Sequence, residues 1–354
     1  MSQREIAIIG DRFMLPDAFT AALEPVLDAD WRVRTLELPW PDEPMHHGYV
    51  GTDGRPPAPG LEGLKEYMGE PDAIAEFIGD AEVLVNHLAP VTGPMLDRLP
   101  RLKLIAVSRG GPVNIDMNAA RERGVLVVNT PGRNASAVAE FTIGAILAET
   151  RLIRAGHEAL RQGIWRGDLY RADLTGTELS ELTVGLIGYG HIGTRVVKLL
   201  KPFGCRILVN DPYKELDPAD AADGVVMTDL DTLLARSDVV SLHARVTEET
   251  KGFLAAPQFA RMKRGAYFIN TARGPMVNYQ DLYEALKSRH VRGAMLETFW
   301  QEPPPPDAPL LKLDNVTLTP HIAGASTTTV RIAARMAAEE VRRWLSGEPP
   351  LNPC

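Results

Sequence analysis

Short apolar runs alternate with amphipathic stretches along almost the whole chain. Runs rich in β-branched residues have the length of buried strands at residues 6–9, 32–38, 83–86, 104–107, 125–128, 184–187, 207–209, 239–242, 266–269, 293–296 and 316–318. Continuous apolar runs are typical of parallel strands that are covered on both faces. Because these runs alternate with helix-like stretches, the pattern predicts βαβ units and therefore an open α/β fold.

Helical periodicity is clearest in three stretches. Residues 135–150, 192–203 and 327–345 each carry apolar side chains at helical spacing on one side. Gly204 and Gly347 follow the second and third stretches, where a glycine commonly ends a helix. Pro202 falls inside the second stretch, and we expect it to shorten the regular helix there.

The segment between Pro39 and Pro71 breaks this alternation. It is rich in proline and glycine and includes PWPDEP and RPPAPG. A loop of this length without secondary structure is uncommon in a compact domain. Two interpretations stay open: a surface excursion packed on its own domain, or an arm that reaches a partner subunit or covers the site. His46 and His47 have no ligand-like neighbours there, and we interpret them as surface residues.

Composition narrows the class of protein. A length of 354 residues favours two domains of unequal size, and no apolar run approaches the roughly 20 residues of a membrane helix. The two cysteines, Cys205 and Cys354, cannot build a disulfide framework, and no Cys/His spacing indicates a metal site. A net charge of −8 disfavours nucleic acid as a partner. We therefore expect a cytoplasmic protein with a small-molecule ligand and without a signal peptide or membrane segment.

A glycine-rich turn follows the run at residues 184–187. Its sequence is Gly188-Tyr189-Gly190-His191-Ile192-Gly193, and an amphipathic stretch begins at once. The strand before and the helix after it are the context that a dinucleotide-binding GxGxxG motif requires. The next run ends near Asp211, whose carboxylate suits the ribose hydroxyls of adenosine and repels a 2′-phosphate. The turn therefore predicts NAD rather than NADP as the cofactor.

Polar and titratable residues follow the later runs, where open α/β sheets bind their ligands. These residues are His243, the run Asn270-Thr271-Ala272-Arg273-Gly274, Glu297 with Glu302 downstream, and Thr319-Pro320-His321. Three of them suit hydride transfer between an alcohol and a ketone. His321 can exchange the hydroxyl proton, Glu302 can fix the imidazole tautomer and favour imidazolium, and Arg273 can hold a substrate carboxylate bidentately.

Four segments resemble the D-isomer-specific 2-hydroxyacid dehydrogenase family. They are GLIGYGHIG, VSLHARVTEETKGFL, MKRGAYFINTARGPMVN and ETFWQEPPPPDAPLLKLDNVTLTPHIAGAS. The likeness covers roughly residues 80–345, and SRGGPVNIDMNAARERGVLVVNTPGRNASAVAEF is similar to the family's substrate loop and the following helix. The resemblance implies interconversion of a small D-2-hydroxy acid and its 2-oxo acid, with Arg273 as the carboxylate-binding arginine and His321, paired with Glu302, as the acid/base.

The resemblance also implies an architecture of two doubly wound parallel sheets. A Rossmann-type cofactor domain, residues 120–321, is inserted in a discontinuous flavodoxin-like substrate domain, residues 1–119 and 322–354, and a homodimer forms through the cofactor domains. Expected cofactor contacts are Gly188, Tyr189, Gly190, His191, Ile192, Gly193, Asp211, His243, Thr250, Thr271, Ala272, Arg273, Glu297, His321 and Gly324. Expected substrate contacts are His87, Arg109, Gly110, Gly111, Arg273 and His321, with the loop 109–114 over the substrate.

The chain departs from the family pattern in three places. Glu297 stands where the family usually has an aspartate near the nicotinamide carboxamide, which predicts a re-spaced contact. The loop 109–114, RGGPVN, is more polar than the common pattern, which favours a short polar acid. Residues 86–88, NHL, replace the basic phosphate-binding residues of phosphoglycerate dehydrogenases, and the long C-terminal extension that some of those enzymes carry does not follow.

Three alternatives remain at this point. The first is phosphoglycerate dehydrogenase proper. The second is formate dehydrogenase, which pairs its histidine with a glutamine, so that Glu302 argues against it. The third is an NAD-sensing binding protein of the same fold, which can keep the same three residues. Measuring NADH oxidation with a panel of 2-oxo acids distinguishes these alternatives.

Overall fold

The computed structural model describes residues 4–40 and 60–354, and the chain divides into two compact units. Unit 1 comprises Met1–Asn134 and Ala325–Cys354, and unit 2 comprises Ala135–Gly324. The expected divisions, after residues 119 and 321, lie earlier in the chain than these. The first difference has a direct cause, because the strand at residues 126–128 pairs with the sheet of unit 1.

Unit 1 is a parallel sheet covered by helices on both faces. Its strands run in the order β2-β1-β3-β4-β5, which is the flavodoxin order. They are β1 (Arg4–Asp11), β2 (Trp31–Leu38), β3 (Val83–Asn86), β4 (Leu104–Val107) and β5 (Leu126–Val128). One core cluster lies under α1 (Pro16–Leu23) and α12 (Thr327–Ser346). The other lies under α2 (Pro71–Ile78), α3 (Gly93–Asp97) and α4 (Met117–Glu122).

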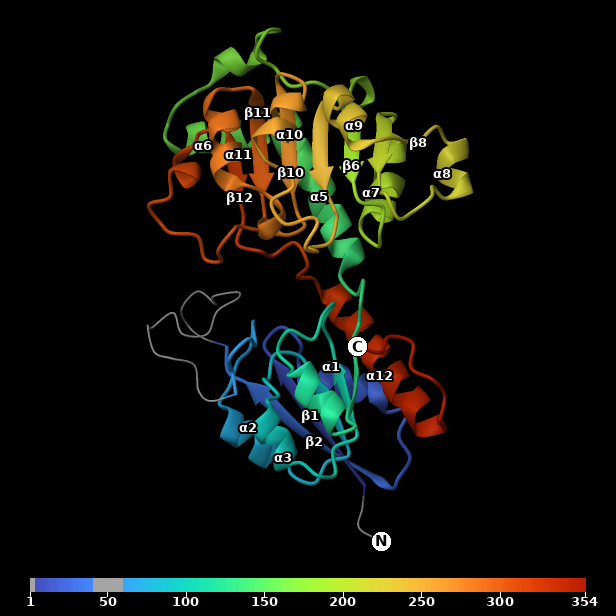
Figure 1. The fold of residues 1–354 in the computed structure, drawn as a ribbon. Helices are drawn as coiled ribbons and strands as arrows, with labels where there is room; N and C mark the ends of the chain where they lie inside the picture. Colours follow the sequence, from blue (N-terminus) through green and yellow to red (C-terminus); the bar gives the residue numbers. More distant parts are fainter. Residues whose placement is uncertain (1–3, 41–59) are drawn as a thin grey trace. The chain divides into compact units, whose positions relative to one another are not determined.

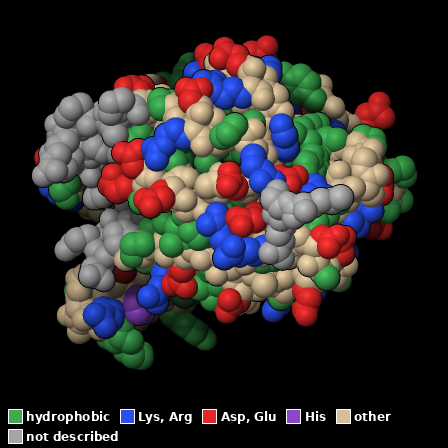
Figure 2. Space-filling model, turned by 90° about the horizontal axis from the view of Figure 1, so that it is seen from below, with side chains coloured by type: hydrophobic (Ala, Val, Ile, Leu, Met, Phe, Trp, Pro, Cys, Tyr) green, Lys and Arg blue, Asp and Glu red, His purple; other side chains and the backbone are tan. Residues whose placement is uncertain are grey.

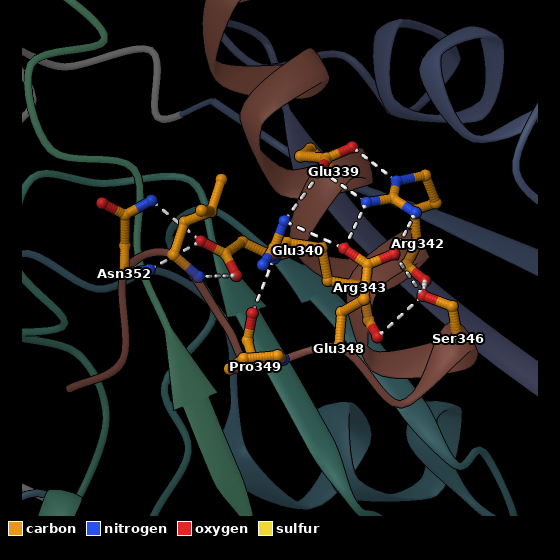
Figure 3. Close-up of polar contacts among 9 residues, drawn as sticks. Glu339, Glu340, Arg342, Arg343, Ser346, Glu348, Pro349 and Asn352 are labelled. Atoms are coloured by element: carbon orange, nitrogen blue, oxygen red, sulfur yellow. Dashed lines mark hydrogen bonds and ion pairs between the residues drawn. The ribbon is translucent and has the colours of Figure 1, made fainter.

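The C-terminal segment is fastened to unit 1 by a buried carboxylate. Glu340 of α12 accepts hydrogen bonds from the backbone N–H of Leu351 (3.1 Å), from the backbone N–H of Asn352 (2.8 Å) and from the Asn352 side chain (2.8 Å). Figure 3 shows these contacts beside a partly exposed network in which Arg342 bridges Glu339 and Glu348. The backbone of Asn352 and Cys354 then pairs with the edge strand β5. The C-terminal residues of unit 1 thus pair with the last strand of its N-terminal segment.

Unit 2 contains a parallel sheet with the strand order β12-β11-β10-β9-β6-β7-β8, the Rossmann order extended by one strand. Its strands are β6 (Thr183–Ile187), β7 (Arg206–Asn210), β8 (Val226–Met227), β9 (Val239–Leu242), β10 (Ala266–Asn270), β11 (Val291–Leu296) and β12 (Val316–Leu318). Helices cover both faces (Figure 1). One face carries α5 (Ala135–Thr150) and α7 (Gly193–Leu200), and the other carries α9 (Leu230–Arg236), α10 (Ala256–Arg261) and α11 (Tyr279–Lys287).

The predicted fold class, two doubly wound parallel α/β sheets, is confirmed, and every predicted strand is present. The short β8 was not predicted, because two residues give no periodicity. The helix predicted at residues 192–203 is regular only to Leu200 and ends in a 3₁₀ turn that contains Pro202, as expected from the missing N–H of proline. Of the Pro/Gly-rich segment, residues 41–59 lie outside the described residues, and so do His46 and His47.

The surface of the described residues mixes the two signs of charge. On the face in Figure 2, Lys and Arg side chains are interspersed with Asp and Glu. Exposed ion pairs such as Arg98–Asp72 and Arg123–Asp97 in unit 1 are part of this pattern. Within residues 4–40 and 60–354, no helix is long and apolar enough to cross a membrane, and no cluster of three metal-ligating side chains occurs.

Candidate active site

The predicted site residues of unit 2 follow the carboxyl ends of neighbouring strands. In sheet order from β7 to β12, these strand ends carry Asp211, Gly188, His243, Thr271–Arg273, Glu297 and His321. Parallel strands place all their carboxyl ends at one edge of the sheet, and the order reverses between β6 and β9. A crevice at such a reversal is where doubly wound sheets bind their ligands.

The glycine turn after β6 has the three steric features that a pyrophosphate cradle needs. Gly188 has a φ of +105°, which disfavours any side chain, and a Cβ there would lie 2.7 Å from the backbone N of Ala244. A Cβ on Gly193 would lie 2.2 Å from the carbonyl oxygen of Gly188, so only glycine lets α7 start so close to β6. A Cβ on Gly190 would meet no atom within 4 Å, which leaves that backbone open to an incoming group. The turn therefore fits a dinucleotide phosphate at the start of α7.

Asp211 is held in place by the same turn. Its Oδ2 accepts the backbone N–H of Tyr189 at 2.8 Å, and its Oδ1 accepts the N–H of Tyr213 at 2.9 Å. The buried Tyr189 donates its hydroxyl to Asp220 of α8 (Pro218–Ala222), and burial raises the pKa of Tyr189 to about 12. The glycine turn, Asp211 and α8 thus form one hydrogen-bonded assembly, a link that the sequence motif alone did not reveal.

The other candidate cofactor contacts lie at the start of α7 and after β9 and β10. His191 is exposed, and Ile192 directly precedes α7. His243 is buried, its Nε2 lies 2.9 Å from the Ser241 hydroxyl, and burial lowers its pKa to about 3. The Thr271 hydroxyl lies 2.9 Å from that of Thr142, and the backbone N–H of Ala272 donates to Asn270.

Two other candidates lie at the ends of loops. Thr250 lies in the turn after β9, where its hydroxyl donates to the carbonyl of Arg245 at 2.7 Å. Gly324 is the last residue of unit 2. Neither position adds a charge to the sheet edge.

Glu297 is engaged by the protein itself. Its side chain is 1% exposed, and its carboxylate accepts the Thr319 hydroxyl and the backbone N–H of Ala323. Burial raises the pKa of this carboxyl above its ordinary value, although both hydrogen bonds oppose the effect. The longer side chain therefore fastens the loop after β12 to the end of β11.

His321 and Glu302 form a direct pair. The Nδ1 atom of His321 lies 2.7 Å from Oε2 of Glu302, while Oε1 of Glu302 accepts the backbone N–H of Phe299 at 2.9 Å. His321 has a φ of +54°, unusual for a residue with a side chain, and its own N–H donates to the carbonyl of Glu297. An ionised Glu302 selects the Nδ1–H tautomer and assigns proton exchange to Nε2.

Arg273 follows the end of β10, and its surface is exposed to solvent. Its Nη1 donates to the carbonyl of Ala272 at 2.8 Å. Desolvation by the protein atoms around the guanidinium lowers its pKa, and the charge of Glu302 opposes that shift, so the two groups are electrostatically coupled. Gly274 permits this arrangement, because a Cβ there would lie 1.7 Å from the carbonyl oxygen of Phe299.

The candidate substrate contacts of unit 1 follow its own strand ends. His87 comes after β3 and is 4% exposed, and Arg109 comes after β4. Arg109 is paired with Glu66, to whose carbonyl its Nη1 also donates at 3.2 Å, a partner that the sequence did not suggest. A Cβ on Gly110 or Gly111 would meet no atom within 4 Å. Both glycines thus leave the loop open.

Sequence reasoning missed two residues at this edge of unit 1. Asp11 ends β1 and contacts His87, and Arg133 follows β5 and also approaches His87. Both could have been found from the sequence. A charged residue at or after the carboxyl end of a parallel strand is a ligand-site candidate, and this rule, used for the later strands, applies equally to the strands of unit 1.

Residues 143–323 match the model of the D-isomer-specific 2-hydroxyacid dehydrogenase NAD-binding domain. A glyoxylate reductase of Thermofilum pendens is 39% identical over 83% of this chain and 90% of its own length. The chain belongs to the D-isomer-specific 2-hydroxyacid dehydrogenase family. It carries the family's NAD-binding domain and is an NAD-dependent dehydrogenase of this family.

Other relatives bear on the fold and on the chain's length. A D-3-phosphoglycerate dehydrogenase of Archaeoglobus fulgidus is 37% identical over 82% of this chain, which spans only 54% of that enzyme. The solved structure of a D-2-hydroxyisocaproate dehydrogenase aligns over 99% of both chains with a TM-score of 0.80 at 22% identity, a likeness of fold alone. The match of residues 143–323 and the 39% identity to the glyoxylate reductase confirm the expected membership of the family.

Proposed function

We propose that this dehydrogenase interconverts a short polar D-2-hydroxy acid and its 2-oxo acid, with His321, Glu302 and Arg273 as the reacting and binding groups. The observation that carries the proposal is the 2.7 Å contact between Nδ1 of His321 and Oε2 of Glu302 at the edge of the NAD-binding sheet. A histidine fixed by a carboxylate is suited to give and take a proton near neutral pH.

NADH, when bound, supplies the hydride that reduces C2 of the 2-oxo acid. The developing alkoxide takes the proton from Nε2 of His321, and the carbonyl becomes a hydroxyl. Glu302 stabilises the imidazolium before transfer and holds the ring in one tautomer afterwards. Arg273 binds the substrate carboxylate and polarises the adjacent carbonyl. The reverse direction returns each group to its starting state.

The test compares two variants of the pair with the wild type. In His321→Ala, reduction of the best 2-oxo acid should fall about 10²- to 10⁴-fold, the usual contribution of a general acid, while NADH fluorescence titration remains close to wild type. Glu302→Gln keeps the shape and the acceptor for the Phe299 N–H but removes the charge. It should lower the rate about 10- to 100-fold.

Two results would contradict this assignment. Full activity in His321→Ala would exclude the histidine as the proton donor. NADH binding by the wild type without turnover of any 2-oxo acid would favour the NAD-sensing alternative. The acceptor panel includes glyoxylate, hydroxypyruvate, pyruvate and phosphohydroxypyruvate, and a clear preference for phosphohydroxypyruvate would instead favour phosphoglycerate dehydrogenase.

The expected homodimer is proposed through a segment of unit 2. The helix α6 (Ile153–Arg161) and the turn after it bury no side chain within the chain. Trp165 is 83% and Tyr170 is 95% exposed, and Ile153, Leu160 and Ile164 are also exposed. Because several large apolar side chains exposed on one segment are costly in water, a second copy of this chain is the occupant that we propose.

A further inference from the structure

A buried tyrosine of unit 2 contacts both loops that carry the proposed reacting groups, and the proposed mechanism does not use it. Tyr279 is the first residue of α11 and is 7% exposed. Asn278 caps this helix by accepting the backbone N–H groups of Gln280 (3.1 Å) and Asp281 (3.2 Å). The phenol ring packs in the hydrophobic core that contains α11. Tyr279 is therefore anchored by its own helix, independently of the two loops.

The hydroxyl of Tyr279 binds one residue at the base of each loop. It donates to the carbonyl oxygen of Thr298 and accepts from Nδ2 of Asn270 at 3.2 Å. Asn270 and Thr298 are both 0% exposed, so these bonds lie away from bulk solvent. Burial raises the pKa of the phenol, and the charge of Glu302 acts in the same direction. The hydroxyl therefore keeps its proton at neutral pH and serves as donor and acceptor at once.

On one side, the hydrogen bonds of Tyr279 lead to Arg273. Oδ1 of Asn270 accepts the backbone N–H of Ala272 at 3.1 Å, which closes a tight turn after β10. The carbonyl oxygen of Ala272 then accepts Nη1 of Arg273 at 2.8 Å. Because Tyr279 binds the amide nitrogen of Asn270, it fixes the side chain that closes the turn. The direction in which the guanidinium extends depends on that turn.

On the other side, the hydrogen bonds lead to Glu302. Thr298 accepts the hydroxyl of Tyr279, and the next residue, Phe299, donates its N–H to Oε1 of Glu302 at 2.9 Å. Oε2 of Glu302 lies 2.7 Å from Nδ1 of His321. A shift of the backbone at residues 298–299 would therefore move the carboxylate that orients the imidazole.

The ring of Tyr279 has a role that can be separated from that of its hydroxyl. Its centroid lies 5.0 Å from that of Trp300 and 6.4 Å from that of Phe299. These contacts need only an aromatic ring, and phenylalanine would preserve them. The two hydrogen bonds need the oxygen, and phenylalanine would lose both. A single substitution thus removes the connection between the loops and keeps the packing.

We propose that Tyr279 is a positioning residue, whose hydroxyl holds the Arg273 turn and the Glu302 loop in one fixed arrangement for hydride transfer. Tyr279 acts through Arg273 and Glu302 and needs no contact of its own with the substrate. Supporting bonds of this kind hold reacting groups within about 0.5 Å of their productive geometry, and a misplacement of about 1 Å can cost about 100-fold in rate. This inference rests on the proposed function, because it concerns residues assigned to the same reaction.

The test removes the hydroxyl and keeps the ring. In Tyr279→Phe, kcat for the best 2-oxo acid should fall about 10-fold or more, and KM for the acid should rise about threefold, since both Glu302 and Arg273 lose their support. The dissociation constant of NADH should stay within about twofold of wild type. Tyr283→Phe is the matched control, because Tyr283 lies one turn later on α11 and its hydroxyl makes no hydrogen bond within residues 4–40 and 60–354. It should keep the wild-type kcat and KM.

A double variant distinguishes positioning from a purely structural role. Glu302→Gln removes the charge that the loop positions, so Tyr279→Phe should reduce kcat much less in that background than in the wild type. A hydroxyl that only stabilises the fold would lower the thermal midpoint and leave kcat unchanged wherever the variant is folded. That result overturns the inference, and so does a loss of kcat by the same factor in both backgrounds.

Asn270→Ser tests the same connection from its other end if Tyr279→Phe does not fold. Serine can still accept the Ala272 N–H in the turn, but it is too short to reach the hydroxyl of Tyr279. Its kcat should fall by about 10-fold as well, and a wild-type kcat overturns the inference. Full activity in His321→Ala would end the proposed function and this inference together. Loss of activity in His321→Ala with a wild-type kcat in Tyr279→Phe would overturn this inference alone.

Discussion

Buried His243 allows a quantitative prediction about acid stability. It follows β9 beside the glycine turn, it is 7% exposed, and its Nδ1 has no hydrogen-bond partner among the described residues. Burial lowers its pKa from 6.5 to about 3. In the unfolded chain the imidazole is solvated and takes up a proton near pH 6.5. Below that pH, therefore, the unfolded state binds more protons than the folded state.

This difference in bound protons determines how His243 changes the free energy of unfolding with pH. Stability rises with pH wherever the unfolded state binds more protons, so the contribution of His243 is complete above about pH 6.5 and is lost as the pH falls toward 3. Each unit of separation corresponds to about 1.4 kcal/mol. Between pH 6 and pH 4 the unfolded chain binds nearly one proton more than the folded protein at this histidine. Integrated over these two pH units, the difference lowers the free energy of unfolding by about 2.5 kcal/mol.

The assay is urea unfolding of wild type and His243→Gln at half-unit steps between pH 4 and pH 6. The variant loses imidazole packing and is less stable at pH 6, but the readout is the slope. The wild-type advantage over the variant should shrink by about 2.5 kcal/mol across this range, since all other titrating groups cancel in the difference. His157→Gln, which removes an exposed imidazole of unit 2, should keep the wild-type pH dependence. A constant difference between wild type and His243→Gln would refute the reasoning.

Two further predictions concern the dimer and the C-terminal fastening. Trp165→Glu with Tyr170→Glu should convert a particle of about twice 38.7 kDa into one of 38.7 kDa in light scattering, since two charges would enter an apolar contact, and a monomeric wild type would rule out this interface. Glu340→Ala should lower the free energy of unfolding by about 2–4 kcal/mol in urea titrations, because three N–H donors lose a buried acceptor. The partly exposed Glu339→Ala is its control and should cost less than about 1 kcal/mol. Equal effects of the two would contradict the fastening role.

The sequence predicted the structure correctly where an apolar pattern extended over several residues, or where a motif had the expected strand before it and helix after it. The strands of both sheets and the helix at residues 135–150 follow from apolar runs, and the glycine turn follows from its flanking strand and helix. The two-residue β8 lies below what periodicity can detect. The pairing of Arg109 with Glu66 joins positions far apart in sequence, so no local pattern could indicate it. The binding of Glu297 to Thr319 and Ala323 is likewise visible only once β11 and β12 lie side by side.

Both sheets keep buried polar atoms without a hydrogen-bond partner near their carboxyl edges. In unit 2 the Glu297 carboxylate and the Glu302–His321 pair are engaged by neighbouring groups of the same unit. Nδ1 of His243 and the Thr298 hydroxyl, however, find no partner among the described residues. In unit 1 the same holds for side-chain atoms of Ser108, Asn114 and Arg133. Each such atom costs about 1–3 kcal/mol, so a chain gains nothing in stability by keeping several of them. Their position at the edges where open α/β sheets bind ligands is explained if bound ligands supply the missing partners.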